Sequence, residues 1–383
     1  MRRWFDLQRW RYGIAALTAC LGLGTLPAWY CGRDAGGWYD GDPELQLGLA
    51  RTLVDFEQGD AQAFERRSKD RFVGEWALVT HQMTALGLAQ LCLTHPEWKE
   101  QLLPAIGRAA TMSFRPEMRD FGTEAWGEDA LATLASSHGH AYLAYSALAV
   151  GMARVVGAPL SPTLIAQHDA LIAAYERRLL ASPTGLIETY PHEAYPTDVA
   201  AVAGAIAVHG RATHEDHGKV LEQWARLVRS RQLDATSGLV IQRMGATDGA
   251  PHDAPRGSGT GLAAYFAGFA DRQLAQELSS ATLAHERSWL GFSGIREYAE
   301  GHTGTGDIDS GPVVLGVSVS ATGFALALAR AHRERDTFVR LYRTTELFGL
   351  SNWRDDRLHF ATGGPIGNAL LLAFLTSGPE IAP

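Results

Sequence analysis

Apolar residues recur along most of the chain at a spacing near 3.6 residues, whereas the alternation typical of strands is almost absent. This pattern predicts an all-α protein with about twelve helices. The expected helices span 44–59, 72–94, 97–112, 138–157, 161–181, 197–212, 215–231, 257–270, 272–286, 310–332, 335–349 and 365–377.

The connections between these helices alternate between short and long. The long ones are rich in Gly, Pro, Asp, His and aromatic residues and span 113–137, 182–196, 232–256, 287–309 and 350–364. In an up-and-down array of helices, successive connections lie at opposite ends. We therefore expect all the long loops on one face, and binding groups commonly gather in loops that a rigid scaffold holds.

The helices also alternate in type. Two of them, 161–181 and 215–231, are amphipathic with a charged face, as expected for an outer layer. Others are apolar all round and rich in small residues, which is typical of helices buried on both sides. These are 197–212, 257–270, 310–332 and 365–377. Six such pairs predict two concentric rings, an (α/α)6 barrel over residues 34–383, and an open α-solenoid is the alternative.

Residues 1–33 form a separate N-terminal hydrophobic segment. Tyr12 to Gly32 contains no charged residue and follows four arginines, which is the layout of a signal peptide or an uncleaved membrane anchor. The cationic flank favours a cytoplasmic N-terminus, so we expect the body outside the cytoplasm, in the cell envelope. The alternative is a hydrophobic helix packed on the body. Cleavage or lipidation of the segment stays open.

The composition limits the classes of partner and cofactor that we expect. The chain has 383 residues, of which 46% are hydrophobic and 20% charged, and its net charge is −8. Segment 1–33 carries +4, so the remainder carries −12, which argues against nucleic acid as a partner. Three cysteines exclude a disulfide framework, and no metal-binding, Walker or Rossmann pattern stands in a suitable context. We therefore expect neither a metal nor a cofactor.

Candidate catalytic residues lie where long loops lead into apolar helices. His140 opens one such helix, within SSHGHAYLAY at 136–145, and Tyr142 stands just inside it. A histidine at this point suits general acid–base work or hydrogen bonding of a substrate. The alternative is a histidine at the edge of the core that backbone groups satisfy.

The loop 184–198 supplies Glu188, Tyr190, Tyr195 and Asp198. A carboxyl group among aromatic and apolar residues has its pKa raised by desolvation, which makes it a usable acid near neutrality. Glu188 is placed in this way, after two apolar residues. Asp198 has a second interpretation, because an acidic residue in the first turn of a helix is favoured by the helix dipole.

The segment GHTGTGDIDSG at 301–311 places Asp307 and Asp309 in a glycine-rich loop before another apolar helix. Two carboxylates two residues apart suit a division of acid and base work or the binding of a hard cation, but the spacing lacks the remaining ligands of a calcium loop. The alternative is that Asp309 and Ser310 cap the following helix.

The order of these segments resembles the bacterial linalool dehydratase/isomerase family over about residues 70–377. The segments that carry the resemblance are GLAQLCLTHPEWK at 87–99, GHAYLAYSALAVG at 139–151, GLIETYPHEAYPTDVAAVAG at 185–204 and GTGDIDSGPVVLG at 304–316. The resemblance implies an (α/α)6 barrel that hydrates, dehydrates and isomerises an allylic alcohol without a cofactor. It places His140 on a histidine of that active site. The family's two active-site cysteines fall at Glu188 and Thr197, so no thiol chemistry is implied.

We therefore expect an enzyme, a cofactor-independent lyase or isomerase acting on a small, terpenoid-like alcohol. Glu188 is the expected acid, with Asp198 or His140 as the base. Tyr142, Tyr190 and Tyr195 are the expected aromatic walls, and Asp307 and Asp309 the expected substrate contacts.

A carbohydrate-active barrel enzyme is the first alternative to this function, supported by paired carboxylates and by Trp126, Trp289 and Trp353 in the loops. A non-catalytic envelope protein is the second alternative. The expected partners are a small-molecule substrate and, through the N-terminal segment, the membrane. The oligomeric state stays open.

Overall fold

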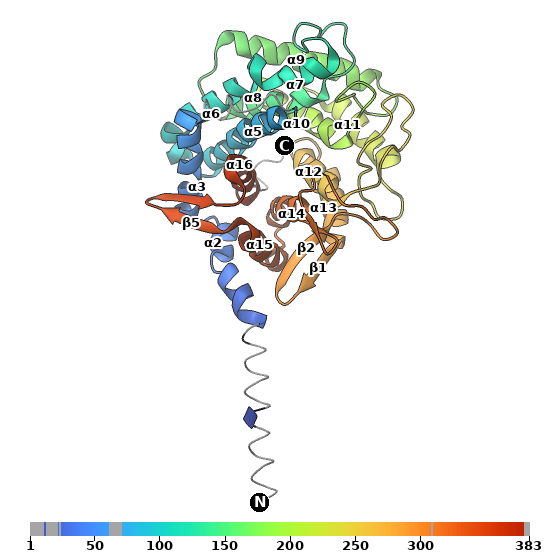
Figure 1. Ribbon diagram of the computed structural model, residues 1–383. Coiled ribbons are helices and arrows are strands. Elements are labelled where there is room, and N and C mark those ends of the chain that lie inside the picture. Colours follow the sequence, from blue (N-terminus) through green and yellow to red (C-terminus); the bar gives the residue numbers. More distant parts are fainter. Residues whose placement is uncertain (1–10, 13–21, 23, 61–70, 308, 379–383) are drawn as a thin grey trace, which may run out of the picture.

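The computed structural model describes residues 11–12, 22, 24–60, 71–307 and 309–378 (Figure 1). Most of the predicted N-terminal membrane segment lies outside these ranges. Residues 24–31 are helical, and Ala28 and Cys31 pack against Phe292 of the body. Within the described ranges, no helix is both long enough and apolar enough to cross a membrane.

Six helices form the inner part of the molecule, and Figure 1 shows them arranged around a common centre. They are α5 (Arg71–Thr94), α8 (Ala144–Val156), α10 (Pro196–Thr213), α12 (Gly257–Ala267), α14 (Val319–Ala331) and α16 (Gly364–Leu375). Each contacts the next in chain order, and α16 contacts α5 again, so the series of contacts returns to its start. Their residues are mainly buried and apolar.

Outer helices cover this inner group. They are α3 (Pro43–Asp55), α6 (Lys99–Ser113), α9 (Pro162–Ala181), α11 (Gly218–Leu227), α13 (Arg272–Ala284) and α15 (Arg335–Gly349). Each contacts one or two inner helices, as α6 contacts α5 and α8. Two further helices are the short α2 (Ala35–Asp40) and α7 (Pro116–Trp126), which lies over α5 and α6. The helices predicted to be amphipathic therefore lie in the outer group, and those predicted to be apolar all round lie in the inner group.

Small residues let the inner helices approach closely. A Cβ atom added to Gly87 of α5 would lie 2.8 Å from a side-chain carbon of Leu372 and 3.0 Å from the backbone nitrogen of Ala373 in α16. A Cβ added to Gly204 of α10 would lie 3.1 Å from the carbonyl oxygen of Phe266 in α12. Backbone-to-backbone packing, which the small residues predict, therefore exists at these two contacts.

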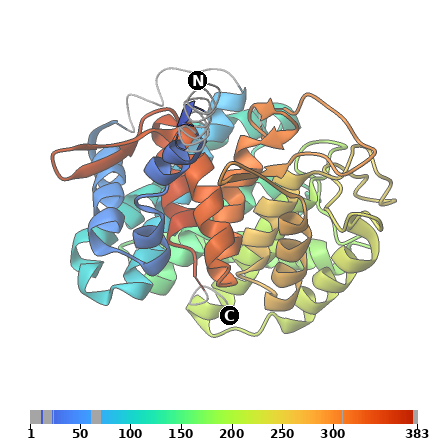
Figure 2. The ribbon, with the colours of Figure 1, turned by 90° about the horizontal axis from the view of Figure 1, so that it is seen from below.

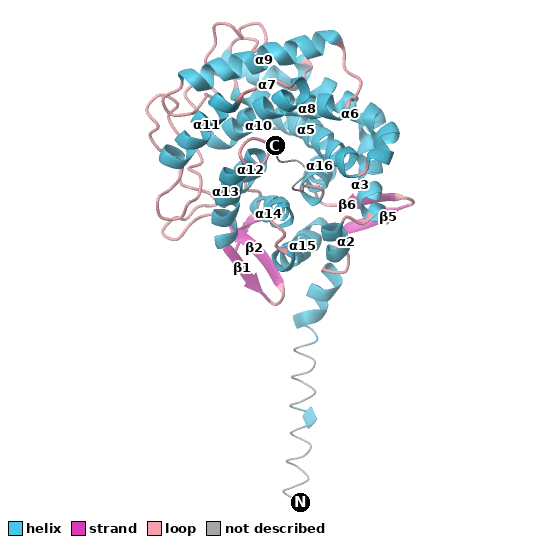
Figure 3. Ribbon diagram, turned by 180° about the vertical axis from the view of Figure 1, so that it is seen from behind, coloured by secondary structure: helices cyan, strands magenta, loops and turns pink. Residues whose placement is uncertain are grey.

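The body is mostly helical, but two small antiparallel sheets interrupt the helices, so the prediction of an all-α body holds only in part (Figure 3). The first has the strand order β1-β2-β4-β3, and the second is the hairpin β5-β6. The strands are β1 (Glu286–Trp289), β2 (Phe292–Arg296), β3 (Val313–Val314), β4 (Val317–Ser318), β5 (Ser351–Arg354) and β6 (Arg357–Phe360). They occupy connections that were expected to be irregular. Strands of two to five residues are too short to give a readable alternation.

Two helix starts also differ from the prediction, and one helix was not predicted. The helix expected at 310–332 begins at Val319, because Gly311 and Gly316 have positive φ angles and residues 313–314 and 317–318 pair as β3 and β4. The helix expected at 138–157 begins at Ala144 after a short 3-10 turn, and His140 is left-handed with φ of 68°. Helix α7 was missed, although Pro116 and Gly127 mark its two ends.

The connections define two ends of the molecule. At the loop end, where the inner helices begin, lie the long segments 114–143, 182–195, 233–256, 285–318 and 350–363. At the turn end, where the inner helices finish, lie the short segments 95–98, 157–161, 214–217, 268–271 and 332–334. Figure 2 shows the helices from the side, with both hairpins and the long loops toward one side.

Candidate functional site

Asp198 lies in the first turn of α10, at the loop end, and both of its carboxylate oxygens accept a hydrogen bond. The Tyr145 hydroxyl donates to Oδ1 and the Thr189 hydroxyl donates to Oδ2, each over 2.6 Å. Burial raises the pKa of Asp198, and these two hydrogen bonds oppose the increase. The carboxylate is therefore held in one orientation by donors from α8 and from the loop 182–195.

Asp309 interacts electrostatically with three further carboxylates, and we call the four residues the carboxylate cluster: Glu75, Asp198, Asp307 and Asp309. Burial and the charges of Asp307, Glu75 and Asp198 together raise the pKa of Asp309 to about 7. The Tyr190 hydroxyl donates a hydrogen bond to Glu75 Oε1 over 2.9 Å. Helices α5 and α10 and the loop 285–318 thus bring like charges together at one end of the molecule.

Arg256 is a cation in contact with this cluster. Its guanidinium group forms an ion pair with Asp307 and a second one, 2.6 Å long, with Asp253. It also lies over the ring of Tyr298, 5.6 Å from the centroid. The charge of Arg256 lowers the pKa of Asp309, but burial and the neighbouring carboxylates outweigh it. Asp307 is therefore the ion-paired member of the loop, and Asp309 is the member that exchanges a proton near neutral pH.

The cluster keeps access to solvent. Glu75, Tyr145 and Asp198 are partly exposed, and Asp309 is exposed. Protein atoms nevertheless surround the carboxylates of Asp198 and Asp309 closely enough to desolvate them. Solvent therefore has access to both Asp198 and Asp309.

His140 lies beside this cluster, in a fully buried position. Its Nε2 lies 3.0 Å from Glu128 Oε1, its ring packs on Trp126 at 4.4 Å, and its carbonyl oxygen accepts a hydrogen bond from Tyr175. Burial lowers the pKa of His140. Trp126 also donates to the carbonyl oxygen of Thr189 over 3.0 Å, which connects the two groups.

Glu188 belongs to the same neighbouring group as His140. Its Oε2 lies 3.3 Å from Nε2 of the exposed His138, and its carbonyl oxygen accepts a hydrogen bond from the backbone of Ala141. Tyr142 is buried and its ring lies parallel to that of Tyr190, with 6.2 Å between centroids. These residues join the segment 126–142 to the loop 182–195.

The structure divides the sequence-predicted residues into two adjoining sets. Asp198, Tyr190, Asp307 and Asp309 belong to the carboxylate cluster or contact it, whereas His140, Tyr142 and Glu188 form the group behind it. Tyr195 is half-buried, donates to Glu193 over 3.2 Å, and has its pKa raised, mainly by burial.

The sequence interpretation missed three residues of the site: Glu75, Tyr145 and Thr189. Thr189 and Tyr145 stand within the segments that were singled out. Glu75 stands near the start of a predicted inner helix, as Asp198 does. An acidic residue close to the start of an apolar helix was the signal that could have found it.

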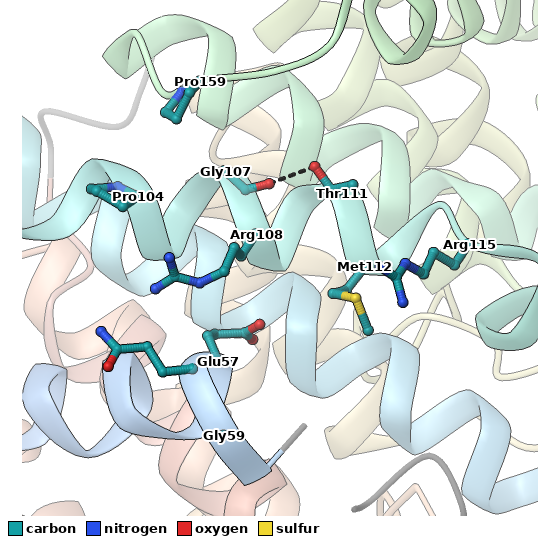
Figure 4. A pocket seen from close by; sticks show the side chains of 10 residues that line it. Glu57, Gly59, Pro104, Gly107, Arg108, Thr111, Met112, Arg115 and Pro159 are labelled. Carbon is teal, nitrogen blue, oxygen red and sulfur yellow. Dashed lines mark hydrogen bonds between the residues drawn. The ribbon is translucent and has the colours of Figure 1, made fainter. Parts of the chain in front are cut away.

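A separate depression lies on the outside of α6. It encloses about 450 Å³ and is lined by Glu57, Gln58, Gly59, Pro104, Gly107, Arg108, Thr111, Met112, Arg115 and Pro159. Figure 4 shows Arg108 pointing from α6 toward the segment that carries Glu57. None of the sequence-predicted site residues lines this depression.

Comparisons with known proteins do not assign the chain to a family. No family model matches the chain, and no curated protein shows significant similarity to it. The chemistry of the site therefore has to be argued from its own residues.

Proposed function

We propose that the helices form an (α/α)6 barrel. The support is the closed series of contacts from α5 through α8, α10, α12, α14 and α16 back to α5, with one outer helix preceding each inner one. In such a barrel all inner helices start at one end. This arrangement gathers side chains near the helix starts, such as Asp198 and Glu75, at one end of the barrel.

The proposed function is that of a cofactor-independent lyase or isomerase that removes, adds or moves a hydroxyl group on a small alcohol. The observation that carries it is the pairing of Asp309, whose pKa is raised to about 7, with Asp198, whose orientation two hydroxyl donors fix. General acid–base catalysis is most efficient when the acid has a pKa near the working pH. The linalool dehydratase/isomerase family, which the chain resembles, carries out this class of reaction.

In the proposed reaction, the two carboxyl groups supply and accept the protons. Protonated Asp309 donates its proton to the substrate hydroxyl, the C–O bond breaks, and water leaves with the bonding electron pair. Carboxylate Asp198 then removes a proton from the neighbouring carbon, and those electrons form the C=C bond. Proton exchange with solvent restores both groups. Addition of water is the reverse sequence, and isomerisation combines the two.

This assignment moves the acid from Glu188 to Asp309. Glu188 lies against His138 and the backbone of Ala141, whereas the charge of Asp309 interacts with that of Asp198. Two aromatic residues contact the cluster, since the Tyr145 hydroxyl donates to Asp198 and the Tyr190 hydroxyl donates to Glu75. An aromatic face there would stabilise a carbocation-like centre.

A carbohydrate-active enzyme remains the second candidate, because two carboxyl groups are also the basis of glycoside hydrolysis. The loop tryptophans give it little support. Trp126 packs on His140, while Trp353 packs on Gly48 of the outer helix α3. Trp289 ends strand β1, next to the exposed hairpin turn. None of the three contacts the carboxylate cluster.

We also propose that the loop end lies at a membrane surface, as the expected N-terminal anchor requires. Every exposed large apolar side chain among the described residues lies either in residues 12–30 or at the loop end. We call the second group the apolar rim: Trp76, Trp289, Leu290, Val314, Leu315, Leu347, Phe348, Leu350 and Trp353. A contiguous exposed apolar surface commonly marks a membrane or protein interface. A lipophilic alcohol could then reach the site from the bilayer.

The function is tested by assaying the full chain against short allylic and tertiary alcohols, linalool included, and against oligosaccharides. We expect turnover of an alcohol, and a fall of about 10²-fold or more in rate for Asp309→Asn, because the amide cannot donate an acidic proton. Glu188→Gln tests the earlier assignment in parallel. Glu300→Gln is the matched control, since Glu300 is an exposed carboxylate in a loop-end segment that lies outside the cluster.

Each result decides between the candidates. Loss of rate in Asp309→Asn with normal rate in Glu188→Gln supports the proposed acid. The opposite result returns the role to Glu188. Turnover of oligosaccharides alone contradicts the lyase and favours the carbohydrate enzyme.

A further inference from the structure

A cluster of histidines and carboxylates lies at the turn end, far from the carboxylate cluster. His209 stands in the last turns of α10, and Glu215 and His217 follow in the short connection to α11. His209 Nδ1 lies 3.1 Å from His217 Nε2, and Glu215 Oε2 lies 4.0 Å from each of these nitrogens. We call His209, Glu215 and His217 the histidine cluster.

The separations suit one metal ion. Zinc binds imidazole nitrogen and carboxylate oxygen at about 2.0–2.2 Å in a tetrahedral arrangement, so two of its ligand atoms lie about 3.4 Å apart. The 3.1 Å between His209 Nδ1 and His217 Nε2 is close to that value, and Glu215 Oε2, which lies 4.0 Å from each nitrogen, has to move about 0.6 Å nearer. Glu215 is exposed and can adjust its side chain, whereas both histidines are buried and fixed in place.

The outer nitrogen of each histidine faces a carboxylate from α9. His209 Nε2 lies 3.1 Å from Asp169 Oδ1, and His217 Nδ1 lies 3.4 Å from Glu176 Oε2. A carboxylate that accepts the outer N–H of an imidazole fixes the tautomer that presents a lone pair to a metal. His209 therefore has the hydrogen-bonded orienting partner that metal-binding histidines usually have, and Glu176 lies within ion-pair distance of His217 Nδ1 without a hydrogen bond between them.

We propose that His209, Glu215 and His217 bind one divalent transition-metal ion, with Zn²⁺ as the best match to two imidazoles and a carboxylate. Asp169 and Glu176 are the positioning residues behind the two histidines. The exposed side of Glu215 leaves a fourth position for water. Because the ligands come from α10 and the connection to α11, and their partners from α9, the ion would hold three helices together at the turn end.

A second possible trio, formed by His168, Asp169 and His209, is less suitable. His168 Nδ1 lies 2.9 Å from the guanidinium group of Arg154, which also forms an ion pair with Asp169. A cation already occupies that side, and a second cation beside it would be repelled.

The test uses the purified full chain, stripped with a chelator, dialysed, and titrated with ZnCl₂. We expect one zinc ion per chain by elemental analysis and a higher melting temperature with zinc. Glu215→Gln removes a ligand at an exposed position, and we expect Kd to rise by about tenfold or more. His217→Gln should weaken binding further. Asp169→Asn should weaken it by about tenfold through the orientation of His209.

His214→Asn is the matched control. His214 is exposed, adjoins Glu215 in the same connection, and has a left-handed backbone that asparagine tolerates. It should bind zinc like the unchanged chain. The proposal is overturned if the unchanged chain takes up no zinc at micromolar concentration, or if Glu215→Gln and His214→Asn bind it equally. Glu215→Gln leaves the buried residues intact, so the test survives failure of the histidine variants to fold.

Discussion

Helix α10 carries a different cluster of titratable groups at each of its ends. Asp198 in its first turn belongs to the carboxylate cluster, and His209 in its last turns belongs to the histidine cluster. Eleven residues separate them, which corresponds to about 16 Å along a helix axis. The two clusters share one scaffold, so their difference comes from the side chains that the neighbouring elements supply.

At the loop end the neighbours of Asp198 and Asp309 have the same charge as these residues, and Arg256 pairs mainly with Asp307. Repulsion and desolvation raise the pKa of Asp309 into the physiological range. At the turn end carboxylates alternate with imidazoles, so opposite or complementary groups face one another. Unfavourable electrostatics of the first kind is typical of catalytic groups. Complementary contacts of the second kind stabilise a fold or hold an ion.

The test of this contrast with the largest expected effect substitutes one residue at each end of α10, in two separate variants. Asp198→Asn should lower turnover about 10²- to 10⁴-fold, because the proposed base is lost, while the melting temperature stays nearly constant. His209→Gln should leave the rate per folded molecule unchanged and reduce the free energy of unfolding by about 1–3 kcal/mol, because Asp169 and His217 lose a hydrogen-bonding partner. Initial rates and thermal denaturation of both variants check this.

The contrast fails if the two variants behave alike. An Asp198→Asn protein with full activity but a markedly lower melting temperature would make the carboxylate cluster a structural element. A slow but stable His209→Gln protein would extend the active site to the turn end. Glu300→Gln serves again as the reference for an exposed carboxylate.

The sequence predicts the elements of α10 better than it predicts the groups around them. The 3.6-residue periodicity located the helix within one residue at each end, and the loop before it pointed to Asp198. The partners of Asp198 come from distant segments, since Glu75 and Asp309 lie more than a hundred residues away in opposite directions. Their proximity depends on how the helices close on one another, and a local pattern carries no such information.

The histidine cluster went unpredicted for a related reason. His209 and His217 lie at the end of a helix and beyond a tight turn, a spacing that matches no metal-binding motif. The orienting carboxylates stand on another helix altogether. The short strands escaped prediction because β3 and β4 comprise two residues each. What the sequence alone conveys is therefore the position of helices and loops, and what it lacks is the pairing between them.

The apolar rim provides a second difference between the ends. In a chain lacking residues 1–33, the double substitution Leu290→Gln and Leu315→Gln should weaken binding to phospholipid vesicles by about tenfold or more, because each buried leucine contributes about 1.5–3 kcal/mol. Flotation of the protein with the vesicles measures the bound fraction.

Thr163→Gln is the matched control, because Thr163 is exposed at the turn end. Equal binding of all three proteins would remove the apolar rim from the membrane interface. Cell fractionation of the full chain and of the chain lacking 1–33 tests the anchor separately. Equal solubility of these two chains would contradict it.

The smallest expected effect concerns the pH dependence of stability. The pKa of Asp309 is about 7 in the folded chain, against an ordinary value of 3.8. The folded state therefore binds this proton more tightly than the unfolded state. The resulting stabilisation is complete below about pH 4 and is lost as the pH rises through 7.

Asp309→Asn has no such ionisation, so the melting temperature of the variant should rise relative to the unchanged chain between pH 5 and 8. Asp309 is exposed and solvent screens its charge, so a gain of about 1–2 °C at pH 8 is expected. Glu300→Gln should show a constant difference over the same range. A constant difference for Asp309→Asn as well would mean that the carboxylate ionises normally, and the loop end would lose the electrostatic property that separates it from the turn end.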